Sequence, residues 1–132
     1  MLSLPGTTIV ATVNRDEKKI QQLHQRGAEV VVLEDIAGRV DLSALMQLLA
    51  QRQINEVMVE AGPTLNGELL LQNLVDELII YMAPSIMGDA ARGLFTLPGV
   101  EKMQDRIALT INDIRAVGRD WRINASVSEK PN

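Results

Sequence analysis

The sequence predicts an α/β fold: a mostly parallel sheet flanked by helices, with a C-terminal antiparallel β-hairpin. Short β-branched or apolar runs alternate with helical patterns from residue 7 to residue 83, which is typical of parallel strands joined by right-handed crossovers. Two alternating runs separated by the turn Gly118–Asp120 then indicate the hairpin. With 132 residues, 46% of them hydrophobic, the chain is long enough for a single domain over residues 1–132.

The first third of the chain contains two expected strands with a helix between them. Thr7–Val13 is rich in β-branched residues and predicts a strand. Asp16–Arg26 is charged with a narrow apolar stripe, so we expect a surface helix that ends at Gly27. Ala28–Leu33 is nearly continuous in valine and leucine, which indicates a parallel strand buried on both faces.

The middle of the chain repeats this alternation. Asp41 is a favourable N-cap for a helix over Leu42–Arg52, whose leucines form one stripe. Glu56–Glu60 is expected to be the third strand and Pro63–Asn73 the third helix. A fourth strand is expected over Glu77–Ala83, ending at Pro84.

The last third is predicted to be a long loop followed by the hairpin. Ser85–Val100 has four Gly or Pro residues and no periodicity, which is typical of a functional loop. Arg106–Val117 is expected to be a strand with a bulge near Asn112, where its apolar positions change register. Tyr81 and Trp121 alternate with apolar neighbours and are expected to pack in the core.

The junction between the third strand and the third helix carries the clearest functional signal. Gly62 allows a tight turn, and Pro63 suits the first helical position. The backbone N–H groups that follow would be unpaired at the positive end of the helix dipole, which suits a phosphate. The alternative interpretation is an ordinary helix start. Gly67 has no side chain, so a ligand could approach the helix closely there.

Glu60 is the second candidate, because it ends the strand that leads into this turn. Ligands of open α/β sheets bind at the carboxyl ends of the strands, where a carboxylate can accept hydrogen bonds from an amide or amine. The alternative is a glutamate that points to solvent or pairs with an arginine. Asp89 and Arg92 in the long loop are weaker candidates, and His24 is expected on a solvated helix face.

Composition excludes several classes of protein. The net charge of −4 argues against a nucleic-acid or membrane-surface protein, and no apolar run is long enough to span a membrane. The lack of cysteine and the single histidine leave no metal site of the Cys or His-rich kind. No dinucleotide fingerprint, P-loop or serine-hydrolase motif is present. Without cysteine or a secretory signal, we expect a cytoplasmic location.

Seven runs of the sequence together resemble a known family. They are Val59–Leu65, Leu74–Leu78, Tyr81–Pro84, Met87–Leu94, Leu97–Lys102, Asp113–Arg115 and Val117–Gly118. The chain resembles the C-terminal reductase domain of the bacterial bifunctional riboflavin-biosynthesis deaminase/reductase, which has a dihydrofolate-reductase-like fold. The resemblance is strong from about Asn55 to Asp120 and loose before that.

The resemblance implies an NADP-dependent oxidoreductase of riboflavin biosynthesis. It would use NADPH to reduce 5-amino-6-(5-phosphoribosylamino)uracil to the ribitylamino product by hydride transfer. By resemblance Glu60 contacts the pyrimidine substrate, and no side chain is assigned a catalytic role. The residues assigned by resemblance to the cofactor phosphates are Gly62, Pro63, Thr64, Leu65, Asn66, Gly67 and Glu68. Many members have two glycines after the glutamate, and here the first of the two positions is Ala61.

The resemblance also implies that this chain is the C-terminal portion of a reductase domain. The leading strand and helices of that domain, and the deaminase domain, are expected to be missing. We therefore expect the isolated chain to have little or no reductase activity. We also expect exposed sheet surface that favours a homodimer. The alternatives are a non-catalytic nucleotide- or phosphate-binding α/β module and a dimerisation fragment.

Overall fold

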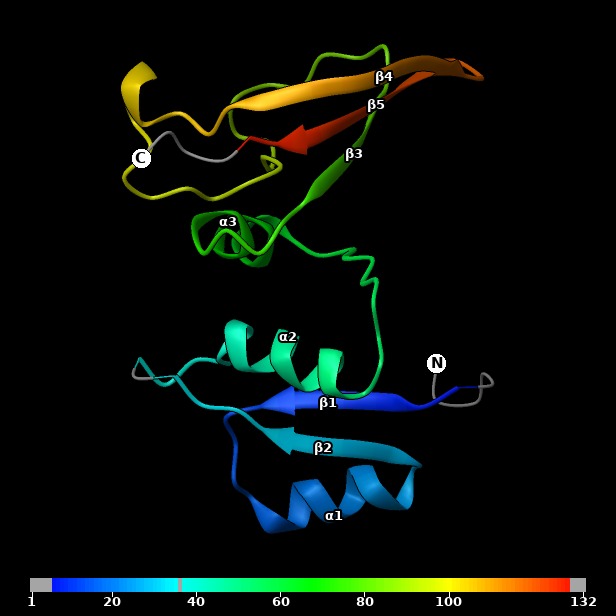
Figure 1. The fold of residues 1–132 in the computed structure, drawn as a ribbon, viewed down its shortest axis with the longest axis vertical. Helices are drawn as coiled ribbons and strands as arrows, with labels where there is room; N and C mark the ends of the chain where they lie inside the picture. Colours follow the sequence, from blue (N-terminus) through cyan, green and yellow to red (C-terminus); the bar gives the residue numbers. More distant parts are fainter. Residues whose placement is uncertain (1–5, 36, 129–132) are drawn as a thin grey trace. The chain divides into compact units, whose positions relative to one another are not determined.

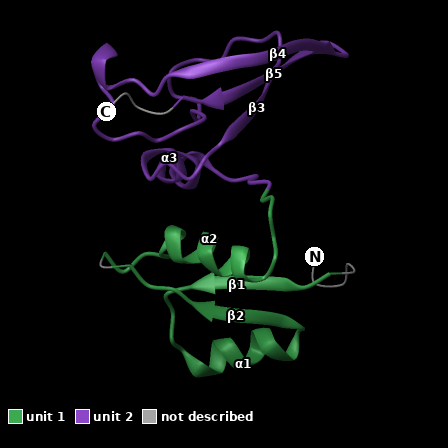
Figure 2. Cartoon of the chain, in the orientation of Figure 1, with its two compact units in different colours: residues 1–57 green, residues 58–132 purple. Residues whose placement is uncertain are grey.

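The computed structural model describes residues 6–35 and 37–128, in which three α-helices, five β-strands and one short 3-10 helix are formed (Figure 1). In chain order these are β1 (Thr8–Thr12), α1 (Glu17–Gln25), β2 (Ala28–Val32), α2 (Leu42–Gln51), α3 (Pro63–Leu71), β3 (Glu77–Met82), η1 (Met103–Asp105), β4 (Leu109–Val117) and β5 (Asp120–Val127). The chain divides into two compact units, residues 1–57 and residues 58–132 (Figure 2).

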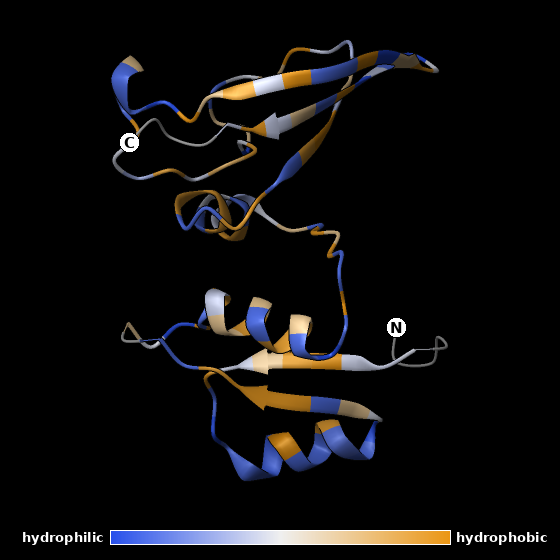
Figure 3. Ribbon diagram, in the orientation of Figure 1, coloured by the Kyte–Doolittle hydropathy of each residue, from blue (hydrophilic) through white to orange (hydrophobic). Residues whose placement is uncertain are grey.

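The first unit is built on one parallel strand pair. β1 and β2 pair in register from Thr8 opposite Ala28 to Thr12 opposite Val32. β2 is largely hydrophobic and α1 largely hydrophilic (Figure 3), in agreement with the expected surface helix. Only Ala28 of β2 is buried, and the remaining residues of the strand are half-buried. The expected burial of this strand on both faces is therefore wrong.

Side-chain caps define where the first two helices begin. The Asp16 carboxylate accepts hydrogen bonds from the N–H groups of Lys18 and Lys19, at 3.0 and 3.3 Å. The Asp41 carboxylate accepts from the N–H of Ala44 at 2.8 Å. Each cap pairs helix donors that have no partner within the helix, so both helices begin where the sequence predicts.

The second unit contains α3 and an antiparallel sheet in the order β3-β5-β4. The hairpin of β4 and β5 is confirmed, and so is the bulge, because the register shifts between Ile111 and Asp113. The Asn112 side chain lies at the bulge and donates to Asn124 Oδ1 at 3.0 Å and to Ser126 Oγ at 2.7 Å. The extra residue thus contributes a polar link across the hairpin.

The expected third strand, Glu56–Glu60, is wrong. Residues 54–62 form no helix or strand, and all of Glu56–Glu60 is exposed. A strand needs a neighbour to pair its backbone groups, and neither sheet of the described residues provides one here. The expected mostly parallel sheet is also not observed, because two of the three pairings between named strands are antiparallel.

The buried hydrophobic residues of the second unit belong to α3 and β5. Leu69, Leu70 and Ala125 are buried, with 4, 5 and 1% of their surface exposed. Tyr81 and Trp121 are 60 and 46% exposed, so their expected place in the core is wrong. The register of the sheet puts Trp121 on an apolar face that is only partly covered and Tyr81 on the opposite, polar face.

Candidate functional site

The turn into α3 has the geometry expected of an anion-receptive helix start. Gly62 is the N-cap with extended backbone (φ −83°, ψ 171°), and Pro63 takes the first helical position. No side chain of the described residues caps the helix, and its first turn carries no acidic residue. The first backbone bond across the turn runs from Asn66 N–H to the Gly62 carbonyl, at 3.1 Å.

Two backbone donors remain available at this helix start. In the part of the chain that the structure describes, the N–H groups of Thr64 and Leu65 donate to no protein acceptor. They lie at the positive end of the helix dipole, where negative charge is stabilised. Unpaired donors of this kind are what a phosphate site at a helix start requires, and the binding of a phosphate here stays a prediction.

Glu60 lies two residues before Gly62, in the segment 54–62 that forms no helix or strand. Its side chain is exposed and forms no ion pair or hydrogen bond with any other described residue. Of the two parts of the alternative interpretation, pairing with an arginine is not observed among those residues, and exposure to solvent is observed. An exposed carboxylate without a partner is able to accept hydrogen bonds from a ligand, and the assignment of Glu60 to the substrate stays a prediction.

Two of the residues predicted to bind the cofactor, Asn66 and Gly67, contact other parts of the protein backbone. Asn66 Nδ2 lies 3.2 Å from the Ala61 carbonyl and 3.5 Å from the Leu94 carbonyl. Gly67 is buried, and the backbone of Thr96 occupies the space where a Cβ would lie. The missing side chain of Gly67 predicts a close approach by a ligand, and in the structure the backbone of the long loop lies there.

The sequence analysis did not place Leu94 and Thr96 at this site. One signal could have indicated the contact, since glycine in a helix interior costs about 0.5–1 kcal/mol relative to alanine. A glycine in the middle of a short helix such as Pro63–Leu71 commonly marks a position where another backbone approaches closely.

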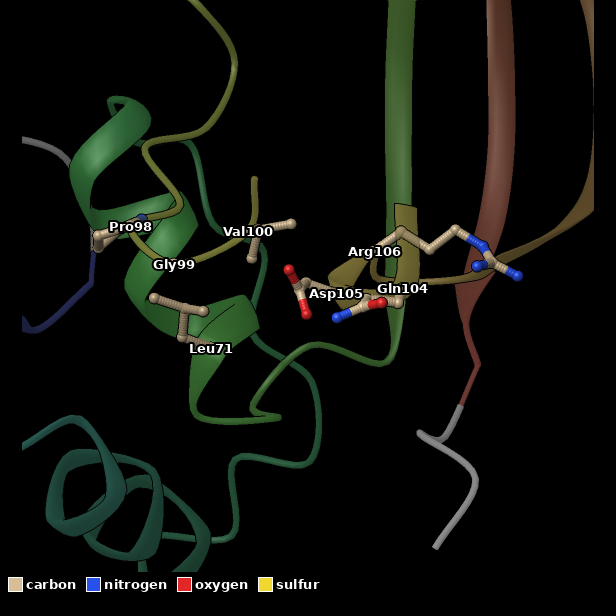
Figure 4. Close-up of a pocket in the computed structure, with 7 residues that line it drawn as sticks. All are labelled: Leu71, Pro98, Gly99, Val100, Gln104, Asp105 and Arg106. Carbon is tan, nitrogen blue, oxygen red and sulfur yellow. The ribbon is translucent and has the colours of Figure 1, made fainter. Parts of the chain in front are cut away.

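A separate hollow of about 400 Å³ lies near the C-terminal end of α3 (Figure 4). Its lining residues are Leu71, Pro98, Gly99, Val100, Gln104, Asp105 and Arg106. None of the predicted site residues contributes to it, and Leu71 is roughly 12 Å from Pro63 at about 1.5 Å per helical residue. The hollow is therefore distinct from the start of α3.

The shifted pKa values lie in the first unit and have structural causes. A hydrogen bond from Arg52 lowers the pKa of Glu29, and the same bond raises the pKa of Arg52. The backbone N–H of Arg39, and then that of Ala37, lowers the pKa of Asp35. Within residues 6–35 and 37–128, no group of three or more His, Cys, Asp or Glu residues could hold a metal ion. No helix of this part is long and apolar enough to cross a membrane.

The structure is that of an α/β chain in which two backbone donors at the start of α3 have no acceptor among the described residues. A model of the RibD C-terminal domain family matches residues 3–123 of the chain. The chain belongs to this family, whose members are reductases of riboflavin biosynthesis.

Individual relatives agree with this result. The riboflavin biosynthesis protein RibD of Escherichia coli K12 is 43% identical over 116 residues, which cover 88% of this chain and 30% of the relative. A 5-amino-6-(5-phosphoribosylamino)uracil reductase of Buchnera aphidicola is 33% identical over 106 residues, covering 80% of this chain and 51% of the relative. The solved structure of Acinetobacter baumannii RibD matches with a TM-score of 0.74 at 27% identity, covering 92% of this chain and 31% of that one.

The chain therefore spans between about a third and a half of the length of these proteins. The match confirms the resemblance noted in the sequence. It also confirms an α/β fold with a small parallel sheet and antiparallel C-terminal strands.

Proposed function

We propose that this chain takes part in the NADPH-dependent reduction of 5-amino-6-(5-phosphoribosylamino)uracil in riboflavin biosynthesis. The main structural support is the pair of free N–H groups at Thr64 and Leu65, which suit the phosphates of a dinucleotide. The name of the Buchnera relative supports this pyrimidine as the substrate.

The cofactor phosphates would bind at the turn Gly62–Leu65, where donors are free and no acidic side chain lies in the first helical turn. Bound NADPH would supply a hydride to the substrate. The reduction adds this hydride to the sugar carbon attached to nitrogen, whose bond to the ring oxygen breaks, and adds a proton to that oxygen. No described side chain is assigned the proton transfer, so the role of this chain is to bind and orient the reactants.

Glu60 is proposed to contact the pyrimidine. Its carboxylate could accept hydrogen bonds from the ring amide or the amino group of the substrate. The side chain directly precedes the turn proposed for the cofactor. The substrate would then bind next to the cofactor, with Glu60 contacting the substrate and the turn that begins at Gly62 contacting the cofactor phosphates.

We further propose that the chain is the C-terminal portion of a reductase domain and has little reductase activity alone. The relatives extend well beyond the matched region, and Glu60 lies in a segment with no paired strand beside it. A homodimer and a cytoplasmic location remain predictions. The alternative function is a non-catalytic module that binds a nucleotide or phosphate. It is favoured if the cofactor binds but no turnover occurs even when the rest of a reductase is supplied.

Titration and turnover of the chain alone test the proposed cofactor site and the proposed incompleteness. NADPH is titrated into the folded chain, and NADPH oxidation is then followed with the pyrimidine substrate. We expect NADPH binding with little turnover. Turnover comparable to that of a full-length relative would refute the proposed incompleteness, and absence of NADPH binding by the folded chain would refute the proposed cofactor site.

A further inference from the structure

The long loop between β3 and η1 is hydrogen-bonded to the start of α3 around Leu94–Thr96. Residues 83–102 contain no helix or strand, and most of their side chains are exposed. Ile86 and Met87, for example, are 101 and 77% exposed. Around Leu94–Thr96, in contrast, the loop backbone contacts the first two turns of α3.

Three contacts make this attachment. The Thr96 N–H donates to the Pro63 carbonyl at 2.9 Å. Asn66 Nδ2 reaches the Leu94 carbonyl at 3.5 Å. The Thr96 carbonyl packs against Gly67, where an added Cβ would lie only 1.9 Å from the oxygen. We call these three contacts the loop clamp.

The side-chain amide of Asn66 donates its hydrogen bonds to the protein backbone and not to a ligand. Both neighbours of its Nδ2 are carbonyl oxygens, which only accept hydrogen bonds, so the nitrogen must face them. Its two hydrogens are then directed at Ala61 and Leu94. What remains for a ligand is the Oδ1 acceptor, which would repel a phosphate rather than bind it.

Gly67 is required by the close approach of the loop. A Cβ cannot lie closer than about 3.0 Å to a backbone atom, so the Thr96 carbonyl would have to move if residue 67 had a side chain. Alanine at this position would leave the helix intact, since alanine favours helix more than glycine does, and would displace the loop. The glycine therefore permits the loop contact and does not hold space for a ligand.

We propose that Asn66 and Gly67 are positioning residues that clamp Leu94–Thr96 onto α3 and so hold the turn Ala61–Leu65 in the shape that binds the cofactor phosphates. This inference rests on the proposed function, and it replaces the direct cofactor contacts that the resemblance implies for these two residues. The physical reason is preorganisation, because a turn that is already ordered loses less conformational freedom on binding. The Asn66 bond to Ala61 orders the turn directly, and the bond to Leu94 ties the turn to the loop.

The clamp is tested first without ligand, by amide hydrogen exchange of the whole chain measured by NMR. Asn66→Ala and Gly67→Ala are each expected to accelerate exchange of the Thr96 N–H at least about tenfold. Asn66→Asp keeps the side-chain volume but removes both donors, and it is expected to behave like Asn66→Ala. The control is Gln47→Ala, which removes an exposed amide from α2 and should leave Thr96 unchanged. Circular dichroism shows whether each variant is folded.

The consequence for the cofactor is tested by NADPH titration of the same variants. We expect the Kd to rise about tenfold in Asn66→Ala and Gly67→Ala and to stay constant in Gln47→Ala. Weaker binding by Asn66→Ala with unchanged Thr96 exchange would overturn the inference, because Asn66 would then contact the cofactor directly. Unchanged exchange in all folded variants would also overturn it. If the wild-type chain does not bind NADPH, the proposed function fails, while the exchange data still decide whether the clamp exists.

Discussion

At the scale of single residues, Glu60 carries the proposed substrate contact. It is an exposed carboxylate without an ion pair among the described residues, so its charge is available to a ligand. Glu60→Gln keeps the size of the side chain and removes the charge. We expect pyrimidine affinity to fall about tenfold or more, since a hydrogen bond to a charged group contributes about 1.5–3 kcal/mol.

Calorimetric titration of both ligands checks this prediction. NADPH affinity should change less than about twofold in Glu60→Gln, since the cofactor is assigned to the turn that follows. The matched control is Glu56→Gln, an exposed carboxylate four residues earlier in the same unpaired segment. Equal losses for the two ligands would contradict the assignment of Glu60 to the substrate.

Glu29 and Arg52 give a prediction about pH. Arg52 Nη1 donates to Glu29 Oε2 at 2.7 Å, and a second bond joins Nη2 to Oε1. The hydrogen bond from Arg52 lowers the pKa of Glu29 from its ordinary value of 4.5. A carboxyl group with a lowered folded-state pKa stabilises the fold above the unfolded pKa, and this contribution is lost as the pH falls through the folded value.

Arg52→Gln should therefore lower the free energy of unfolding at pH 7, and the difference from wild type should shrink below pH 4.5. Urea unfolding at pH 7 and at progressively lower pH measures the difference. Arg119→Gln, in the turn between β4 and β5, serves as the control for loss of an exposed arginine. A difference that stays constant down to acid pH would show that Arg52 acts by packing alone.

At the scale of elements, helix caps decide where the helices begin. Asp16 accepts two backbone hydrogen bonds at the start of α1. Asp16→Ala should lower the free energy of unfolding of the chain by about 1 kcal/mol, within a range of about 0.5–2 kcal/mol. Urea unfolding measures this loss. Gln22→Ala, in the middle of α1, should change it by less than about 0.5 kcal/mol, and an equal effect of both changes would contradict the capping role.

The elements that the sequence predicted well are those with local determinants. Asp16 and Asp41 cap their helices with their carboxylates, and Pro63 suits the first position of a helix. The alternation of apolar and polar residues, with a change of register near Asn112, indicates the bulged hairpin. Glu56–Glu60 was predicted to be a strand because its residues favour one, yet strand formation needs a partner distant in sequence. The contact of Thr96 with Gly67 likewise joins residues 29 positions apart: the glycine within a helix marks a close approach, but no local pattern specifies Thr96 as the partner.

At the scale of the whole molecule, the antiparallel sheet presents an apolar face that is only partly covered. Its exposed members are Met82, Leu109, Ile111, Ile114 and Trp121, each between 43 and 58% exposed. This face contains no charged residue of the paired strands, so two copies could meet there without charge repulsion. The predicted homodimer would bury this surface.

Ile114→Lys should convert the dimer into a monomer, because the new charge would have to be buried at the interface. Light scattering of the purified chain over a range of concentrations measures the mass. Thr110→Lys, on the opposite face of β4, is the control and should leave the dimer intact. A wild-type chain that stays monomeric at high concentration would contradict the prediction.

The start of α3 carries the central claim, and an NMR titration of the folded chain with NADPH tests it most directly. We expect saturable shifts that are largest at the amide resonances of Thr64 and Leu65, whose N–H groups have no acceptor among the described residues. Glu60→Gln should leave these shifts in place, because its carboxylate is assigned to the substrate. Saturable shifts confined to other residues, or no shifts at all in a folded chain, would contradict the claim that this helix start is the cofactor site.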